Sequence, residues 1–332
     1  MKKVILAEPR GFCAGVVRAI DMVERALEIH GPPVYVRKQI VHNHHVVRSL
    51  EAKGAVFVDT EEEVPPGSVC VFSAHGVSPE VRSNAAGRGL DVIDATCPLV
   101  SRVHQHARRV TRDERILLLI GHADHEETEG TRGEAPRRTI VVETVEDVAR
   151  LPLADDTPVA YLTQTTLSMD ETADIVEALK ARFTDLVGPR GDTICYASQN
   201  RQNGVKSLAA QCDLVLVVGS RNSSNSLRMV DVARQAGTAA HLVPDTTHLD
   251  GTWLDGVSTV GVSSGASVPE VLVTQLLDTL GDLGFRDITV ERTSVEDVHF
   301  SVPQQLAEGR RTGRRPAGAA ASPAEPTDRS AT

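Results

Sequence analysis

Three cysteines stand where a predicted strand gives way to a predicted helix. Cys13, Cys97 and Cys195 each lie beside glycine, proline or polar residues, directly before a helical pattern. A helix N-terminus lowers the pKa of a thiol and favours the thiolate, which is the form that binds metal. None of the three has a C-x-x-C partner or a histidine at zinc-finger spacing. Three thiolates therefore suit an iron–sulfur centre with one open iron better than a structural zinc site, which needs a fourth protein ligand.

The other two cysteines fit a structural role. Cys70 lies inside the apolar run Val69–Phe72, and Cys212 lies beside the run Leu214–Val218. Free cysteine is commonly buried and inert, so we predict core packing for both. An odd number of cysteines without a C-x-x-C pair also excludes a secreted disulfide framework.

Polar loops after other predicted strands could bind an anion. His42, His75 and His125 each follow such a strand, although for any one of them a structural role is equally well supported. Neighbouring loops add hydroxyl and amide groups: Thr165, Ser223, Asn225 and Ser267. Neutral donors, backbone amides and helix N-termini together suit a phosphate or diphosphate. No G-x-x-x-x-G-K-[ST] or G-x-G-x-x-G motif is present, so we do not expect a nucleotide cofactor bound in the usual way.

One carboxylate lies in the same loop as His125. Glu127 could deliver a proton if it is buried near the substrate. The alternative is helix capping, because acidic residues favour the first turn of a helix.

The elements that must position these residues follow a βαβ pattern. Short β-branched runs alternate with helical patterns, which predicts an α/β fold with mostly parallel sheets. We expect strands before the three cysteines and before six polar loops: Val4–Ala7, Val92–Ala95, Asp192–Ile194, Val34–Ile40, Val69–Phe72, Ile116–Ile120, Val159–Leu162, Leu214–Val218 and Thr259–Val262. Because open α/β sheets bind ligands at the carboxyl ends of their strands, nine such loops can meet at one central site.

The spacing of the cysteines predicts three similar domains. The intervals between positions 13, 97 and 195 are each the size of a small domain. We place the domains at residues 1–96, 97–193 and 194–303. Residues 304–332 are rich in Gly, Arg, Ala, Pro and Ser, and this composition predicts a disordered tail.

Composition excludes several classes of function. The 332 residues are 41% hydrophobic and 24% charged, as in a globular protein, and carry a net charge of −10. This charge and an aromatic content of 3% argue against nucleic acid or anionic lipid as the main partner. The apolar runs are shorter than the roughly 18 residues of a membrane span. An acidic residue at position 8 argues against a signal peptide, so we expect a cytoplasmic protein.

Four motifs occur together in this sequence: Gly11–Val16, Asp94–Val100, Asp192–Ala197 followed by Asn200–Gln202, and Asn222–Ser226. In this combination the chain closely resembles the 4-hydroxy-3-methylbut-2-enyl diphosphate reductase family, also called LytB or IspH, over residues 3 to 303. The resemblance implies three α/β domains arranged as a cloverleaf around a 4Fe-4S cluster, with Cys13, Cys97 and Cys195 as its ligands.

The resemblance also implies roles for residues in the loops. The diphosphate pocket of the family maps to His42, His75, His125, Ser223, Ser224, Asn225 and Ser267. Proton delivery maps to Glu127 and Thr165, with Gln164 adjacent. The sequence departs from the family pattern at two places. It has Glu126 between His125 and Glu127, where the family usually has proline, and Ser263-Ser264 in place of Thr-Ala.

The implied reaction is the reductive dehydroxylation of (E)-4-hydroxy-3-methylbut-2-enyl diphosphate to isopentenyl diphosphate and dimethylallyl diphosphate, the last step of the non-mevalonate isoprenoid pathway. Since no flavin or nicotinamide motif is visible, we expect a ferredoxin or flavodoxin to donate the electrons. One alternative is a non-redox iron–sulfur hydro-lyase acting on a small anionic substrate, which would need no reductant. A second is an iron–sulfur sensor, for which the sequence offers no DNA-binding element.

Overall fold

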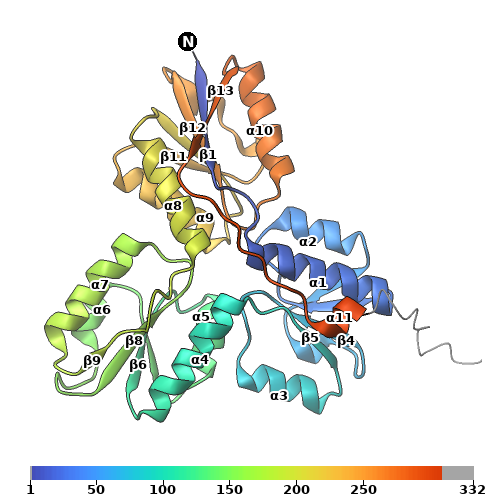
Figure 1. The fold of residues 1–332 in the computed structure, drawn as a ribbon, viewed down its shortest axis with the longest axis vertical. Helices are drawn as coiled ribbons and strands as arrows, with labels where there is room; N and C mark the ends of the chain where they lie inside the picture. Colours follow the sequence, from blue (N-terminus) through green and yellow to red (C-terminus); the bar gives the residue numbers. More distant parts are fainter. Residues whose placement is uncertain (1, 309–332) are drawn as a thin grey trace, which may run out of the picture.

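A computed structural model describes residues 2–308, which form three lobes around a common centre (Figure 1). Each lobe contains one parallel β-sheet covered by helices, and all ten strand pairs are parallel. The predicted α/β class with three similar small domains is confirmed.

Lobe I follows Cys13 and has a four-stranded sheet in the order β3-β2-β4-β5. Its main elements are α1 (Ala14–His30), β2 (Val34–Arg37), α2 (His44–Glu51), β3 (Ala55–Val58), β4 (Val69–Phe72), α3 (Pro79–Gly87) and β5 (Asp91–Asp94). β2 ends before the predicted Ile40, because Lys38 adopts a left-handed backbone conformation with φ of 57°.

Lobe II follows Cys97 and repeats this plan in the order β7-β6-β8-β9. Its elements are α4 (Pro98–Arg112), β6 (Ile116–Ile120), α5 (Glu126–Gly133), β7 (Thr139–Val142), α6 (Val145–Arg150), β8 (Val159–Thr163), α7 (Met169–Arg182) and β9 (Leu186–Val187). The predicted strand Asp192–Ile194 is wrong: these residues form a loop. This segment leaves lobe II for lobe III and has no strand to pair with. A buried hydrogen bond of 2.6 Å between the hydroxyls of Thr163 and Thr193 holds it instead.

Lobe III follows Cys195 and has a five-stranded sheet in the order β11-β10-β12-β1-β13. Its main elements are α8 (Tyr196–Ala209), β10 (Leu214–Val218), α9 (Ser224–Gln235), β11 (Ala239–Val243), β12 (Thr259–Ser264), α10 (Glu270–Asp282) and β13 (Asp287–Arg292), joined by the N-terminal β1 (Lys3–Glu8).

The position of β1 corrects the domain boundary predicted at residues 1–96. Lys3 pairs with Thr259 of β12 and with Asp287 of β13, so the N-terminal strand lies inside the sheet of lobe III. The apolar run Val4–Ala7 is buried throughout. Such a run needs a strand position covered on both faces, and the interior of the largest sheet supplies it.

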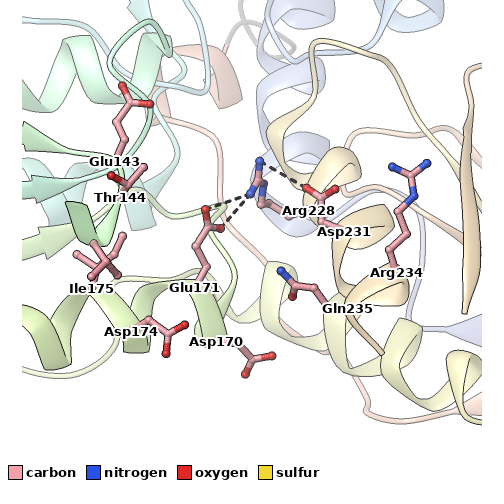
Figure 2. Close-up of a pocket in the computed structure, with 11 residues that line it drawn as sticks. Glu143, Thr144, Asp170, Glu171, Asp174, Ile175, Arg228, Asp231, Arg234 and Gln235 are labelled. Atoms are coloured by element: carbon pink, nitrogen blue, oxygen red, sulfur yellow. Dashed lines mark hydrogen bonds and ion pairs between the residues drawn. The ribbon is translucent and has the colours of Figure 1, made fainter. Parts of the chain in front are cut away.

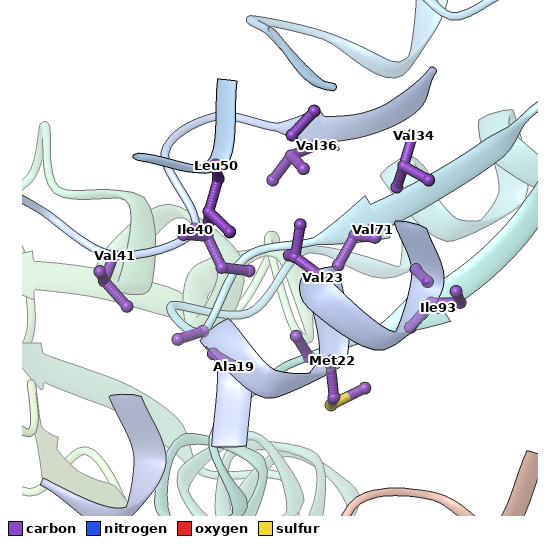
Figure 3. Packing of buried hydrophobic residues seen from close by; sticks show 14 of the residues in the cluster. Ala19, Met22, Val23, Val34, Val36, Ile40, Val41, Leu50, Val71 and Ile93 are labelled. Carbon is purple, nitrogen blue, oxygen red and sulfur yellow. The ribbon is translucent and has the colours of Figure 1, made fainter. Parts of the chain in front are cut away.

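Lobe I illustrates how helices and strands form each core. In α1, Ala19, Met22 and Val23 lie on one helical face against Val36 and Val71 of the sheet (Figure 3). Their spacing of three and four residues is that of an amphipathic helix with one buried stripe.

The C-terminal segment also packs on lobe I, which corrects the predicted start of the tail at residue 304. Residues Gln304–Glu308 form the short helix α11, and Leu306 is buried in the core cluster of α1. Burial of this one apolar side chain in the cluster stabilises the short helix, although the residues around it are mostly polar. Residues 309–332, which the composition predicts to be disordered, lie outside the described residues.

Lobes II and III meet along helices α7 and α9. Arg228 of α9 forms an ion pair with Glu171 of α7 at 3.0 Å, and a longer one with Asp231 of its own helix at 3.5 Å (Figure 2). Lys206 of α8 adds a second bridge to Asp170, at 2.7 Å.

Across residues 2–308, none of the helices combines the length and apolar character that a bilayer-spanning segment needs.

Candidate active site

The topology brings six loops to the centre of the molecule. In every sheet the first and third strands of the lobe are neighbours: β2 with β4, β6 with β8, and β10 with β12. Loops that leave two such strands at their carboxyl ends open a crevice, the usual ligand site of parallel sheets. These six loops carry His42, His75, His125, Thr165, Ser223 and Ser267.

A central cavity of about 110 Å³ collects the predicted residues. Its walls include Cys13, Cys97, Cys195, His42, His75, His125, Glu127, Thr165, Ser223, Ser224, Asn225 and Ser267. Gln164 is not part of the wall. It is buried behind it, where its Nε2 donates to Thr166 Oγ1 at 2.8 Å. Thr166 Oγ1 in turn donates to Ser224 Oγ at 3.0 Å, so Gln164 supports the wall from behind.

Two wall residues with polar side chains were not assigned to the site by the sequence analysis. Thr166 and Ser198 line the cavity beside the predicted groups. Thr166 directly follows Thr165 in the loop after β8, and that polar loop was the available signal. Ser198 lies in the first turn of α8, where its Oγ accepts a hydrogen bond from Asn225 Nδ2 at 3.3 Å. No sequence pattern singles out this serine.

Each cysteine is the N-cap residue of the helix that starts a new lobe: Cys13 of α1, Cys97 of α4 and Cys195 of α8. Each also donates its backbone N–H to the loop that follows the third strand of the preceding lobe. The acceptors are the carbonyls of Ala266 at 3.1 Å, Ala74 at 3.0 Å and Thr165 at 2.8 Å, respectively. The three thiols are therefore fixed by equivalent contacts at the three junctions between lobes.

Burial has the largest effect on the pKa of two of these thiols. Together with the neighbouring Cys13, it raises the pKa of Cys97 to about 11 and that of Cys195 to about 12, with burial the larger cause. Backbone N–H groups of the helix N-termini lower these two pKa values by less than burial raises them, so the lowered pKa predicted from the sequence is wrong for Cys97 and Cys195. Thiolates at this place need a positively charged partner.

The cysteine sulfurs are too widely spaced for one metal ion. Two thiolates bound to one ion at about 2.3 Å cannot be more than about 4.6 Å apart. Among the described residues, the one set of His, Cys, Asp and Glu ligand atoms that all lie within 4.8 Å of one another is His42, His75 and Glu126, and the cysteines form no such set. The thiols surround a space that suits a polynuclear group.

Gly15 keeps this space open. It lies in the first turn of α1, and a Cβ at this position would be 2.8 Å from Cys97 Sγ and 3.9 Å from Cys13 Sγ. The first distance is shorter than a carbon and a sulfur tolerate without contact, so only glycine fits between the two thiols as they stand.

The three histidines form a cluster on another wall. The rings of His42 and His75 are stacked, with centroids 4.0 Å apart, and His125 meets both edge-on at 5.3 and 5.9 Å. Burial lowers the pKa of His42 and His125 to about 3 and that of His75 to about 4. The ligand-free cluster is therefore uncharged at neutral pH.

Hydrogen bonds assign the tautomer of His125. Its Nδ1 accepts the backbone N–H of Glu127 at 3.1 Å, so the ring proton of the neutral histidine lies on Nε2. Within residues 2–308, His125 Nε2 and His42 Nδ1 are buried and have no hydrogen-bond partner. Buried polar atoms without a partner require a ligand, and the Nε2–H of His125 can donate a hydrogen bond to it.

Glu127 is the buried acid of the site. Its Oε1 accepts the backbone N–H of Thr165 at 2.6 Å, and its Oε2 accepts the Thr165 hydroxyl at 2.9 Å. Burial raises the pKa of Glu127 to about 7, although both hydrogen bonds lower it. A carboxyl with this pKa can hold a proton at neutral pH and transfer it.

The serine and asparagine wall is built around the N-terminus of α9. Ser223 caps this helix, and its Oγ accepts the N–H of Ser226 at 3.4 Å. Asn225 Oδ1 accepts the N–H of Ala266 at 2.9 Å, and Ser267 Oγ donates to the carbonyl of His42 at 3.0 Å. These contacts join the wall to the loop after β12 and to the histidine cluster. A helix N-terminus beside hydroxyl groups is a site for an anion.

Comparison with known proteins agrees with this geometry. The sequence model of the LytB protein family matches residues 4–281. The 4-hydroxy-3-methylbut-2-enyl diphosphate reductase of Nocardia farcinica is 56% identical over 93% of this chain and 93% of its own length. The enzyme of that name from Cutibacterium acnes is 54% identical over 94% of this chain and 97% of its own length.

Two solved structures are also similar. The E-1-hydroxy-2-methyl-but-2-enyl-4-diphosphate reductase of Plasmodium falciparum superposes with a TM-score of 0.90 at 38% identity, covering 92% of this chain and 97% of that one. A second structure, described as the terminal enzyme of the non-mevalonate pathway, has a TM-score of 0.61 at 32% identity and covers 85% of this chain and 100% of that one.

Proposed function

The chain belongs to the LytB protein family, and from this premise we propose how its central cavity works. The chain is an enzyme that reduces (E)-4-hydroxy-3-methylbut-2-enyl diphosphate, the substrate in the names of its relatives. The terminal hydroxyl group is lost as water, with consumption of two electrons and two protons, and isopentenyl diphosphate and dimethylallyl diphosphate are formed. The observation that carries the proposal is that three thiols, three neutral histidines and a buried acid line one cavity.

We propose that Cys13, Cys97 and Cys195 hold a 4Fe-4S cluster. Three thiols spaced too widely for one ion, with Gly15 leaving room between two of them, support a polynuclear group. When bound, the cluster would supply electrons one at a time and a Lewis-acidic iron without a protein ligand. A ferredoxin or flavodoxin is the donor that we propose.

The diphosphate end of the substrate is assigned to the histidine cluster and the α9 wall. His125 presents Nε2–H, and the hydroxyls of Ser223, Ser224 and Ser267, with the Asn225 amide, add neutral polar groups. The N-terminus of α9 contributes its positive dipole end. Binding energy from this end of the substrate positions the hydroxyl-bearing carbon at the thiol end of the cavity.

Glu127 and Thr165 are assigned to proton delivery. When Glu127 is protonated it can donate to Thr165 Oγ1, whose own proton then turns toward the cavity, so the pair moves a proton from a buried carboxyl to the substrate side. The distance of 2.9 Å between the two oxygens is short enough for this transfer.

The requirement for a reductant tests this function against the hydro-lyase alternative. Anaerobically purified enzyme is mixed with the substrate, with and without a reduced viologen dye, and the products are identified by mass spectrometry. We expect isopentenyl and dimethylallyl diphosphate only with reductant, together with stoichiometric oxidation of the dye. Conversion of the substrate at the same rate without reductant would overturn the proposal in favour of a hydro-lyase.

A further inference from the structure

Glu126 forms a contact that the assigned site does not use. It is the first residue of α5 in lobe II, and its Oε2 lies 3.0 Å from Nδ1 of His75 in lobe I. The His75 and Glu126 side chains are 14% and 21% exposed, so the contact is largely shielded from water. The resemblance to the family predicts a proline at this position, which could not make it.

This contact fixes the protons of His75. A carboxylate next to Nδ1 requires a proton on that nitrogen, because two lone pairs would otherwise face each other. In the neutral ring, Nε2 then carries a lone pair and is an acceptor. A phosphate oxygen also carries lone pairs, so the ligand-free state of His75 is unsuited to a diphosphate.

Adding one proton to the pair resolves this mismatch. With a proton on Nε2, His75 becomes a donor to a phosphate oxygen, and Glu126 balances the positive charge of the ring. The net charge of the pair rises from −1 to zero, which also removes its repulsion of the anion. The proton is shared within the pair, whichever of the two residues formally holds it.

Burial opposes a second proton on the His75 ring until an anion arrives. Burial is the main cause that lowers the pKa of His75 to about 4, whereas burial raises the pKa of Glu126. The charged and titratable groups that face the pair are His42, stacked on His75, His125 on its edge, and Lys38 and Arg37 near Glu126. Arg37 is itself paired with Glu61 at 2.9 Å, so it is not free to replace the missing proton.

We propose that Glu126 is a positioning residue that makes diphosphate binding proton-coupled: the enzyme takes up one proton at the His75–Glu126 pair when the substrate's diphosphate binds. This inference rests on the proposed function and adds a pH sensitivity to it. For one coupled proton, the dissociation constant rises about tenfold per pH unit between the pKa of the pair in the free enzyme and its higher pKa in the complex.

The variant Glu126→Gln distinguishes proton-coupled binding from a merely structural contact. The uncharged amide can donate to Nδ1 or accept from it, so the neutral ring can carry its proton on Nε2 without taking one from solution. Glu129→Gln is the matched control, because Glu129 is an exposed acid on the same helix. Both changes remove one negative charge from α5, and only the first alters the environment of His75.

The test is anaerobic calorimetry of the cluster-loaded enzyme with 4-hydroxy-3-methylbut-2-enyl diphosphate and no reductant, so that binding occurs without turnover. Titrations between pH 7 and 8.5, in buffers of different ionisation heat, give the protons taken up. We expect about one more proton for wild type and Glu129→Gln than for Glu126→Gln, whose affinity should depend correspondingly less on pH. Titration of the ligand itself is common to all three proteins and cancels in the comparison.

The outcomes are distinguishable. Equal proton uptake in wild type and Glu126→Gln, both with an intact cluster spectrum, would overturn the inference and leave the proposed function standing. Loss of uptake in His75→Ala as well as in Glu126→Gln would support it. Failure of the cluster-loaded wild type to bind the substrate at all would contradict the proposed function itself.

Discussion

Glu127 shows how burial sets the chemistry of a single side chain. Its carboxyl is 2% exposed and has a pKa of about 7 because burial disfavours its charged form. Both of its oxygens contact Thr165, so it is held in place as well as protonated. This combination distinguishes it from the exposed Glu129 of the same helix.

The first prediction concerns the proton of Glu127. Glu127→Gln keeps the size of the side chain and removes the acid, so we expect turnover to fall by about 10²- to 10⁴-fold, the usual contribution of a positioned general acid. Substrate affinity, measured without reductant, should change little. Steady-state kinetics with a chemical reductant provides the check. A wild-type rate in this variant would place the acid elsewhere, with His125 as the next candidate.

The pH profile gives a second prediction. The pKa of Glu127 is raised, so the acid stays protonated to about pH 7 and loses its proton above that value. The turnover number should therefore be constant below pH 7 and fall above it, with a limit of tenfold per pH unit. Rapid-mixing measurements at saturating substrate separate this effect from binding. A turnover number that rises between pH 7 and 9 would show that the residue acts as a base.

His42 should affect binding rather than chemistry. Its Nδ1 is buried without a partner among the described residues, so we expect it to contact the diphosphate. Removing a hydrogen bond to a charged group costs about 1.5–3 kcal/mol, so His42→Ala should raise KM about 10- to 100-fold and leave kcat nearly unchanged. The control is His45→Ala, which removes an exposed histidine of α2. A loss confined to kcat would contradict the assignment of His42.

At the scale of residues, the sequence predicted which residues form the site better than it predicted their contacts and pKa values. The residues predicted to bind or react line the cavity, except Gln164, which lies behind it. The Glu126 contact depends on His75 in another lobe, which the chain order does not reveal. The direction of the pKa shift was predicted wrongly for Cys97 and Cys195, because helix position is visible in a sequence and burial is not.

At the scale of elements, the junction between strand and helix is the unit that builds the site. A cysteine begins each of α1, α4 and α8, and its backbone is tied to a loop of the preceding lobe. Arg201 of α8 reinforces one junction: it is fully buried and donates to the carbonyl of Gly11 at 2.7 Å, next to Cys13. The first turns of these helices therefore have little freedom.

Gly15→Ala tests this packing. The new methyl group would collide with Cys97 Sγ, so we expect metal affinity to fall about 10- to 100-fold, as when a support of a metal ligand is lost. Gly281→Ala is the control, since a Cβ at this helical glycine of α10 meets nothing within 4 Å. Iron release to a chelator under anaerobic conditions measures the effect. Equal release from both variants would show that α1 can move away from Cys97.

Local pattern predicted most strands of the fold, but it gave a false strand at Asp192–Ile194 and assigned the correctly predicted strand Val4–Ala7 to the wrong lobe. Strands such as Ile116–Ile120 and Leu214–Val218 are continuous apolar runs, and their burial follows from composition alone. The loop at Asp192–Ile194 has a strand-like sequence but no neighbour to pair with. β1 has neighbours, but they lie more than two hundred residues away in the chain, at β12 and β13. Local sequence carries no signal for a partner at that distance.

For the molecule as a whole, the cavity exists only when the three lobes meet. Glu127 of lobe II and His75 of lobe I act beside serines of lobe III, so the relative position of the lobes sets the geometry of the site. The ion pair between Arg228 of α9 and Glu171 of α7 contributes to this position (Figure 2).

Arg228→Gln should loosen this contact. A partly buried pair of this kind contributes about 1 kcal/mol, so we expect a similar loss in the free energy of unfolding by urea. The loss should shrink in 1 M salt, where surface charges are screened. Lys180→Gln, which removes an exposed pair within α7, should leave unfolding unchanged. A loss that is the same at low and high salt would show that Arg228 stabilises by packing rather than by charge.

The central claim is that the three corner cysteines hold one cluster at the meeting point of the lobes. Iron and acid-labile sulfide in anaerobically purified protein test it most directly, with Cys97→Ser compared with Cys70→Ser. Cys70 is fully buried in β4, away from the cavity wall. The account predicts about four irons and four sulfides per chain in wild type and Cys70→Ser, and a strongly depleted, inactive Cys97→Ser protein. A full complement of iron and sulfide with normal turnover in Cys97→Ser would contradict it.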